Sequence, residues 1–137
     1  MRPIKFRGKT KVGNEWIYGT TISQGTIKRK ANMWYMEVAE NKWKGLQPES
    51  LGQYIGLRDK NGMEIYEGDI LFAVNLRILP FYRDGTLYRG MGGKFEVVYN
   101  GCGFYLKNKE GDCINFLSGW EYEVVGNIYD NRELINE

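Results

Sequence analysis

The chain of 137 residues contains no histidine, two cysteines and three prolines. Without histidine it cannot form a Ser-His-Asp triad, a Cys-His pair, an HExxH zinc site or an imidazole general base. Two cysteines are too few ligands for a zinc site within one chain. No apolar run reaches the roughly 18 residues of a membrane span, and charged residues interrupt the N-terminus where a signal peptide would be apolar. We therefore expect a cytoplasmic protein without a cofactor, a bound metal or a membrane partner.

The two cysteines flank a predicted hairpin with its turn at residues 108–111. That turn pairs Leu106 with Cys113, and the resulting register leaves Cys102 too far along the ladder for a disulfide. Reduced thiols are also the rule in the cytosol. We expect both Cys102 and Cys113 to be free.

Aromatic residues make up 15% of the chain, charged residues 26%, and there are 18 glycines. This composition is typical of a globular protein built from short β-strands and glycine turns. We predict a mainly β fold with one domain over residues 1–137. The alternative is two subdomains, with N-terminal β-strands in 1–50 and a barrel-like part in 51–137.

Charge is distributed unevenly along the chain. Residues 1–60 carry 12 Lys and Arg against 5 Asp and Glu, while residues 61–137 carry 7 against 12. The two halves therefore have opposite net charges, which predicts a polarised surface. The basic side is expected to be built from Lys28, Arg29, Lys30, Lys42 and Lys44.

Local patterns predict several strands and turns. Asn61-Gly62 supplies the positive φ of a tight turn, which predicts a hairpin between residues 54–57 and 64–66. Alternation over 33–38 places Trp34 and Met36 on one strand face and Met33 and Tyr35 on the other. Residues 75–93 contain four glycines and no sustained period, as in a long loop or a hairpin. We expect an antiparallel sheet that closes into an SH3-like barrel in the C-terminal half, with the N-terminal strands packed beside it.

A family resemblance emerges from three stretches of the sequence. The run from Gly52 to Ile70, GQYIGLRDKNGMEIYEGDI, resembles the central signature of the YopX family, small proteins found mostly in bacteriophages and prophages. The remaining matches, to the family's start and close, are Ile4-Lys5-Phe6-Arg7 and Glu123-Val124-Val125-Gly126-Asn127-Ile128-Tyr129 with Glu133-Leu134. The resemblance implies a mostly β fold and a phage or prophage setting in a bacterial host cell. It implies no activity and no functional residues.

Glu67 and Asp69 are the only carboxylate pair that suggests catalysis. They are either turn residues whose oxygens accept backbone N–H groups, or an acid/base or metal-binding pair on one strand face. We favour the turn, because a catalytic pair also needs a cleft and a third participant. An enzyme that depends on these carboxylates and a metal is therefore the minor alternative.

Basic and aromatic residues alternate between Thr26 and Lys44, as in proteins that bind phosphates and stack bases. The competing interpretation is that the tryptophans belong to the core and the lysines to a solvated face. The candidate nucleic-acid-binding residues are Lys28, Arg29, Lys30, Trp34, Lys42, Trp43 and Lys44.

A second group of arginines and aromatic residues lies in segment 75–93 and is typical of a protein interface. Its candidate interface residues are Arg77, Phe81, Tyr82, Arg83, Tyr88 and Arg89. We therefore expect a non-enzymatic binding module of phage or prophage origin, whose ligand is single-stranded nucleic acid or a host or phage protein. The alternative is a homo-oligomeric interaction or structural protein assembled through segment 75–93.

Overall fold

The structure, a computed structural model, describes residues 3–27, 30–75, 81–88, 92–101, 103–116 and 120–136. Strands dominate these residues, and the helices among them are two short 3-10 turns. Every strand register in these ranges is antiparallel, which confirms the predicted mainly β, antiparallel fold. No helix in the described ranges is long and apolar enough to cross a membrane.

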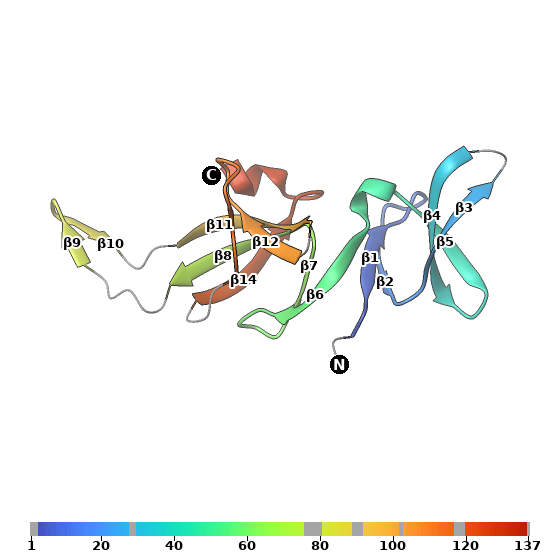
Figure 1. Cartoon of the computed structure of the whole chain (residues 1–137), viewed down its shortest axis with the longest axis horizontal. Helices are drawn as coiled ribbons and strands as arrows, with labels where there is room; N and C mark the ends of the chain where they lie inside the picture. Colours follow the sequence, from blue (N-terminus) through green and yellow to red (C-terminus); the bar gives the residue numbers. More distant parts are fainter. Residues whose placement is uncertain are drawn as a thin grey trace. The chain divides into compact units, whose positions relative to one another are not determined.

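The chain forms two compact units, Met1–Gly56 and Leu57–Glu137. In Figure 1 they run from blue to green and from green to red. The first unit has ten Lys and Arg against four Asp and Glu, whereas the second has nine against thirteen. The opposite charges of the two halves of the sequence therefore belong to separate folding units.

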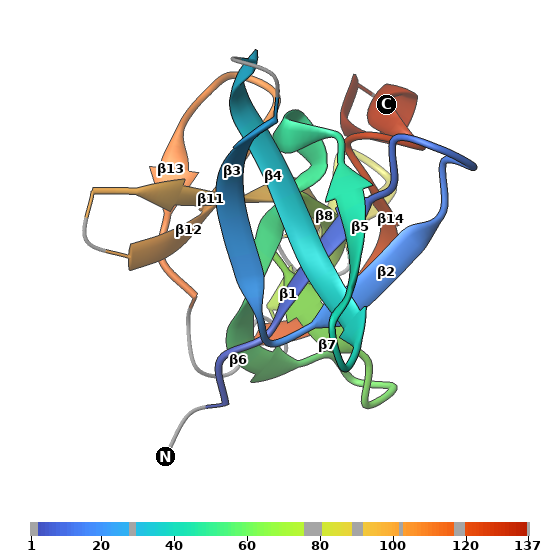
Figure 2. The same cartoon turned by 90° about the vertical axis from the view of Figure 1, so that its right-hand side faces the viewer.

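The first unit consists of two small sheets. Its elements are β1 (Phe6–Lys9), β2 (Trp16–Gly19), β3 (Ile22–Ile27), β4 (Lys30–Ala39), β5 (Lys42–Leu46), η1 (Pro48–Ser50) and the start of β6 (Gly52–Arg58). Strands β2, β1 and β6 are neighbours in one sheet, and β3, β4 and β5 form the other, which lies in front in Figure 2. A bridge between Thr10 and Leu46 links the end of β5 back to the end of β1.

Two glycines allow these sheets to approach each other. A Cβ on Gly8 of β1 would lie 3.1 Å from the Leu46 side chain, and one on Gly19 of β2 would lie 3.1 Å from the Met36 sulfur. Met36 and Leu46 are completely buried. The core of the first unit therefore lies between the two sheets, and it depends on the missing side chains at Gly8 and Gly19.

The second unit is built around a five-stranded sheet. Its elements are β7 (Glu64–Tyr66), β8 (Asp69–Asn75), β9 (Phe81–Arg83), β10 (Thr86–Tyr88), β11 (Gly92–Asn100), β12 (Gly103–Lys107), β13 (Cys113–Ile114), β14 (Trp120–Asn127) and η2 (Arg132–Asn136). The sheet order is β13-β12-β11-β8-β14, and its buried side chains include Leu71, Val97 and Leu106. Closure into an SH3-like barrel stays a prediction.

Two predicted hairpins are confirmed. The first is that of Asn61-Gly62: β6 and β7 are neighbours, and the Asp59 N–H donates to Met63 O at 2.8 Å. The second arises in segment 75–93, where the hairpin alternative is correct because β9 and β10 pair with each other. Asp84 and Gly85 at their turn have φ angles of 51° and 77°, as in the tight turns that join paired strands.

The order of the strands within each sheet is not revealed by the sequence. In the second unit the final strand β14 lies beside β8, followed by β11, β12 and β13. In the first unit β1 lies between β2 and β6, and the other sheet has the order β3-β4-β5. The segment that contains β9 and β10 connects β8 to β11.

The predicted register of Cys113 is wrong by one residue. Cys113 pairs with Lys107, because the turn runs from Asn108 to Asp112, whose backbone groups hydrogen bond at 3.0 Å. Cys113 is a free, exposed cysteine. Cys102 lies outside the described residues.

Candidate nucleic-acid interface

The two tryptophans of the predicted site lie on opposite faces of the β4–β5 pair. Trp34 pairs with Leu46, whereas Trp43 pairs with Glu37. Because side chains alternate along a strand, Trp34 shares its face with buried Met36, as the alternation predicts. Trp43 is on the outer face and is 42% exposed. One aromatic residue of the predicted site therefore belongs to the core side and the other is available to a ligand.

The cations of the predicted site are partly described. Lys42 and Lys44 are exposed on β5. Lys28 and Arg29 lie outside the described residues, as does the side chain of Lys30. The candidate interface in segment 75–93 lies outside them as well: Arg77 and Arg89 entirely, and the side chains of Phe81, Tyr82, Arg83 and Tyr88.

The outer face of the β3-β4-β5 sheet brings further functional residues together. Tyr35 lies opposite Gly45 in the register, and its ring is 3.4 Å and 3.8 Å from the Cβ positions of Gly25 and Gly45. Neither glycine has a side chain to cover the ring. The Lys11 side chain passes 4.0 Å from the Gly45 Cβ position, and its Nζ donates to the Met33 sulfur at 3.1 Å. A cation therefore lies beside a half-buried aromatic ring.

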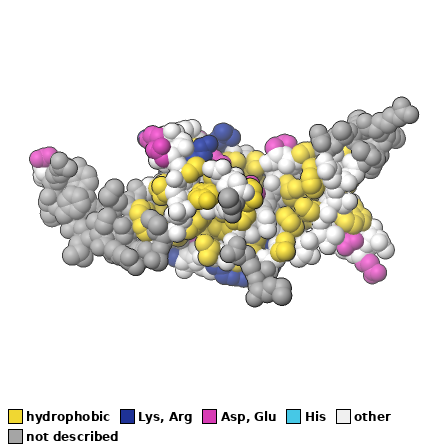
Figure 3. All heavy atoms as spheres, viewed as in Figure 1, with side chains coloured by type: hydrophobic (Ala, Val, Ile, Leu, Met, Phe, Trp, Pro, Cys, Tyr) yellow, Lys and Arg dark blue, Asp and Glu magenta, His cyan; other side chains and the backbone are white. Residues whose placement is uncertain are grey.

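We call this surface the Tyr35 face, defined as the outer side of β3, β4 and β5 with Lys11 across it. Figure 3 shows that hydrophobic side chains gather over the strands of each unit on the face in view. On the Tyr35 face, Trp43 and Tyr35 provide apolar rings while Lys11 provides charge. Aromatic rings beside cations are what a single-stranded nucleic acid requires, because bases stack and phosphates need neutralisation.

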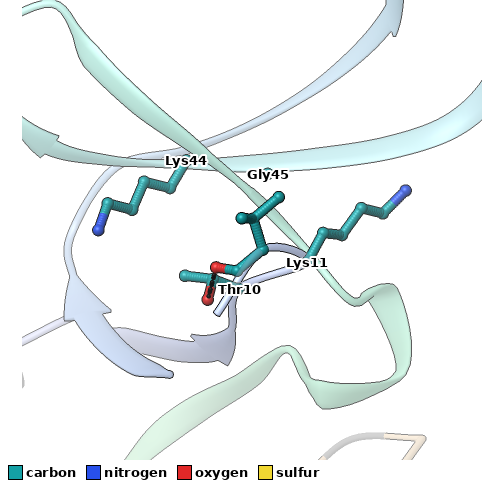
Figure 4. A pocket seen from close by; sticks show the side chains of 5 residues that line it. Thr10, Lys11, Lys44 and Gly45 are labelled. Atoms are coloured by element: carbon teal, nitrogen blue, oxygen red, sulfur yellow. Dashed lines mark hydrogen bonds between the residues drawn. The ribbon is translucent and has the colours of Figure 1, made fainter. Parts of the chain in front are cut away.

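A hollow of about 440 Å³ is lined by Thr10, Lys11, Val12, Lys44 and Gly45. Of these residues, Lys44 pairs with Met36 and therefore lies on the face of the sheet opposite to Tyr35. Figure 4 shows Lys11 and Lys44 leaving it on opposite sides, with Thr10 and Gly45 between them. Val12 is 90% exposed. The described lining residues include two lysines and no carboxylate, which suits an anionic ligand.

Hydrogen bonds hold the turn that carries Lys11. The Thr10 hydroxyl donates to Val12 O at 2.8 Å and accepts the Glu15 N–H at 3.0 Å. The Gln47 side-chain amide donates to Thr10 O at 3.1 Å and to Asn14 Oδ1 at 2.6 Å. The backbone of Lys11 is therefore held in place before a ligand binds, and less conformational entropy is lost on binding.

The cations of β1, and Lys5 just before it, are engaged with rings of the same unit. Arg7 lies 4.7 Å and Lys9 lies 5.5 Å from the Trp16 ring centroid, and Lys5 lies 5.7 Å from that of Tyr54. Arg7 is also buried. Cation–π contacts account for these residues, so we do not place them in the candidate site.

The lysines of the candidate site differ in how close they are to acidic residues. Glu37 faces Trp43 across β4 and β5, and Glu40 lies at the turn that joins these strands. Lys42 is therefore close to carboxylates in the sequence, whereas the part of the hollow's lining that the structure describes contains Lys11 and Lys44 and no carboxylate.

The two carboxylates of the signature, Glu67 and Asp69, differ in their surroundings. The Asp69 carboxylate is buried and accepts the Tyr66 N–H at 2.8 Å. Glu67 and Gly68 form the turn between β7 and β8, so the alternative that Glu67 and Asp69 share a strand face is wrong. Among the described residues no cluster of three or more His, Cys, Asp or Glu can hold a metal.

Asp59 joins the signature turn to β14. Its Oδ1 accepts the N–H groups of Asn61 and Met63 at 2.8 Å and 2.9 Å, and its Oδ2 accepts that of Val124 at 3.0 Å. Burial acts to raise the pKa of Asp59, but these hydrogen bonds and the charge of Lys60 together hold the pKa below its usual value. The central signature and the closing stretch of the chain therefore stabilise each other.

Lys11, Met33 and Tyr35 are functional candidates that sequence reasoning missed. The alternation of side chains along the strand does place Met33 and Tyr35 on the face opposite Met36. The sequence therefore contained a signal that these two residues lie on the outer face. No local pattern connects Lys11 to this face, since the contact depends on the hydrogen bond of its N–H to Gly45 O at 3.0 Å.

These features define a two-unit antiparallel β protein with a basic, aromatic sheet face on its first unit. The sequence model of the YopX protein family matches residues 5–136, so the chain belongs to the YopX family, as its signature suggests. Among solved structures, the chain is similar to the crystal structure of protein EF1440 from Enterococcus faecalis. The identity is 21% and the TM-score 0.49, over 96% of this chain and 97% of that one. No curated protein matches the chain.

Proposed function

We propose that this protein is a non-enzymatic binding module whose first unit takes up single-stranded nucleic acid on the Tyr35 face. The observation that carries the proposal is the placement of Tyr35, Trp43 and Lys11 on one side of the β3-β4-β5 sheet. Bases of any identity stack on such rings, while the cation neutralises the backbone. We extend the proposal to a phage or prophage setting in a bacterial host cell, which the family resemblance implies.

The test is fluorescence anisotropy with a labelled oligothymidine of about 12 nucleotides, within the size range of small β-barrel sites. We expect the wild-type protein to bind, and Tyr35→Ala and Trp43→Ala each to weaken binding by about 1 to 3 kcal/mol, because each removes a stacked base. Tyr18→Ala is the matched control, since Tyr18 is 58% exposed but lies on β2, outside this sheet. Equal losses in all three variants, or no binding by the wild type, would refute the proposal.

A protein or a second copy of the chain is the other candidate partner. The observation that favours it is the hairpin of β9 and β10, which forms a two-stranded sheet of its own. Isolated two-stranded hairpins are marginally stable in water, so this one gains from a partner that covers it.

A further inference from the structure

We infer that the open edge of β5 binds an extended, acidic segment of a partner protein as an added strand. The inference goes beyond the proposed function and does not rest on it, because it concerns the edge of the β3-β4-β5 sheet and not its outer face. β5 is the last strand of that sheet. An edge strand offers backbone N–H and C=O groups to another chain, and a peptide that adds to the edge gains main-chain hydrogen bonds.

The hydrogen bond between β5 and the end of β1 shows which backbone groups point to the open edge. The Lys11 N–H donates to Gly45 O at 3.0 Å, from the side of β5 that does not face β4. Because successive residues of a strand point their backbone groups to alternate edges, those of Trp43 point to this side too, whereas those of Lys44 point to β4. Within the described ranges, the Gly45 N–H and the backbone N–H and C=O of Trp43 have no hydrogen-bond partner. The edge therefore offers two donors and one acceptor.

The hollow of about 440 Å³ lies where β1 departs from β5. A bridge joins Thr10 to Leu46, and the chain then turns away through Lys11 and Val12. The turn lines one side of the hollow, and Lys44 and Gly45 of β5 line another, as Figure 4 shows. The volume is within the range of ligand sites. An added strand can therefore continue the line of β1 along the first residues of β5.

The two faces of β5 predict the side chains of the partner. Lys42 and Lys44 lie on one face, whereas Trp43 lies on the other, opposite Glu37. Both lysines and Trp43 are exposed. An added strand places alternate side chains on the two faces, so acidic residues beside the lysines and an apolar residue beside Trp43 are complementary. An acidic residue on the Trp43 face would instead meet Glu37. We therefore expect a segment that alternates acidic and apolar residues.

The first experiment is an NMR titration of the full chain with an end-blocked peptide of alternating valine and glutamate. Its length is about nine residues, within the usual range of a strand. At saturating peptide, we expect hydrogen exchange at the Trp43 and Gly45 amides to slow by about tenfold or more, because their N–H groups become bonded. The Lys44 amide, which faces β4, should keep its rate. A peptide of alternating valine and lysine is the control and should bind several-fold more weakly, because it presents like charges to the lysines of β5.

The second experiment removes the outward N–H with Gly45→Pro. Proline is tolerated on an edge strand where its nitrogen points away from the sheet. Gly45→Ala is the matched control, because it keeps the N–H and its Cβ would lie 3.8 Å from the Tyr35 ring, an ordinary contact. We expect the proline variant to bind the valine-glutamate peptide about tenfold more weakly, and the alanine variant to bind within about twofold of the wild type. Lys44→Gln should weaken binding by about two- to fivefold, because it removes one pair of opposite charges.

Several results would overturn the inference. It is wrong if the wild type does not bind the valine-glutamate peptide, if the Lys44 amide gains as much protection as those of Trp43 and Gly45, or if Gly45→Pro and Gly45→Ala bind equally. Where circular dichroism shows that the proline variant is unfolded, the exchange pattern of the wild type decides. If oligothymidine protects these two amides and the peptide does not, the edge is a nucleic-acid site. If the free protein already protects them and loses this protection on dilution, a second copy of the chain occupies the edge, and in both cases the inference is wrong.

Discussion

Asp59 shows how one residue of the signature stabilises the second unit. Its carboxylate accepts three backbone N–H groups, and the adjacent Lys60 N–H donates to Tyr122 O at 3.0 Å. Lys60 Nζ also lies 3.4 Å from Glu123. A turn is thereby tied to the edge strand β14, which is far away in the sequence. Covering that edge also removes exposed backbone groups that could pair with another chain.

We predict that Asp59→Asn destabilises the protein by about 1 to 3 kcal/mol at neutral pH, because an amide has one acceptor oxygen and its NH₂ group meets a donor. The lowered pKa of Asp59 means that its stabilisation is complete above the unfolded pKa of about 3.9. It is lost as the pH falls through the lower folded pKa. Urea unfolding at about pH 7 and about pH 2.5 therefore measures a difference that shrinks in acid.

Asp112→Asn is the control for this prediction, since it makes the same change at an exposed position. We expect it to change the free energy of unfolding by less than about 0.5 kcal/mol. If the Asp59→Asn variant were as stable as the wild type at neutral pH, the three hydrogen bonds would make no net contribution to the free energy of unfolding.

At the scale of elements, the hairpin of β9 and β10 lies in the connection between β8 and β11, which are neighbours in the five-stranded sheet. Because the five-stranded sheet includes neither β9 nor β10, the hairpin is an addition that suits an assembly role.

We predict that replacing residues 76–91 with a short glycine-serine linker leaves the chain folded, because β8 and β11 retain their pairing. We expect the assembly size in solution to fall, or capture of a phage or host protein to be lost. Light scattering after size-exclusion chromatography measures the first outcome, and thermal unfolding verifies the fold. Loss of folding would place the segment in the core, and an unchanged assembly and partner profile would make it dispensable.

At the scale of the whole molecule, a net charge of +2 conceals two units with opposite charge. A nucleic acid is attracted by the excess of ten Lys and Arg over four Asp and Glu in the first unit, while the acidic excess of the second unit repels it. The net charge alone therefore underestimates the affinity of the first unit for anions.

We predict that an oligonucleotide containing a photoreactive thymidine analogue cross-links to residues 1–56 and not to residues 57–137, because only the first unit has a basic excess. Mass spectrometry of the cross-linked peptides identifies the site. Raising the salt concentration is the control, since it weakens phosphate contacts and should reduce the yield. Cross-links concentrated in the second unit would contradict both the charge argument and the Tyr35 face.

Local chemistry made part of this fold predictable. Asn61-Gly62 predicts its hairpin because the turn needs a positive φ, and the φ of Gly62 is 81°. Alternation along β4 predicts which side chains enter the core, because neighbouring residues of a strand point to opposite faces. The charge asymmetry was visible too, because the division of the sequence at residue 60 lies close to the boundary between the two units after Gly56.

The sequence by itself thus determined the antiparallel β class, the main hairpin and the family, all of which depend on neighbouring residues or on a contiguous signature. Tertiary structure decided that Lys11 crosses Gly45 to reach Met33, that Asp59 binds Val124, and that Trp34 and Trp43 face opposite ways. Each depends on strand register and on contacts between distant segments. A shift of the strand register by one residue would move every side chain of that strand to the opposite face of the sheet. The packing of the whole unit determines which register forms.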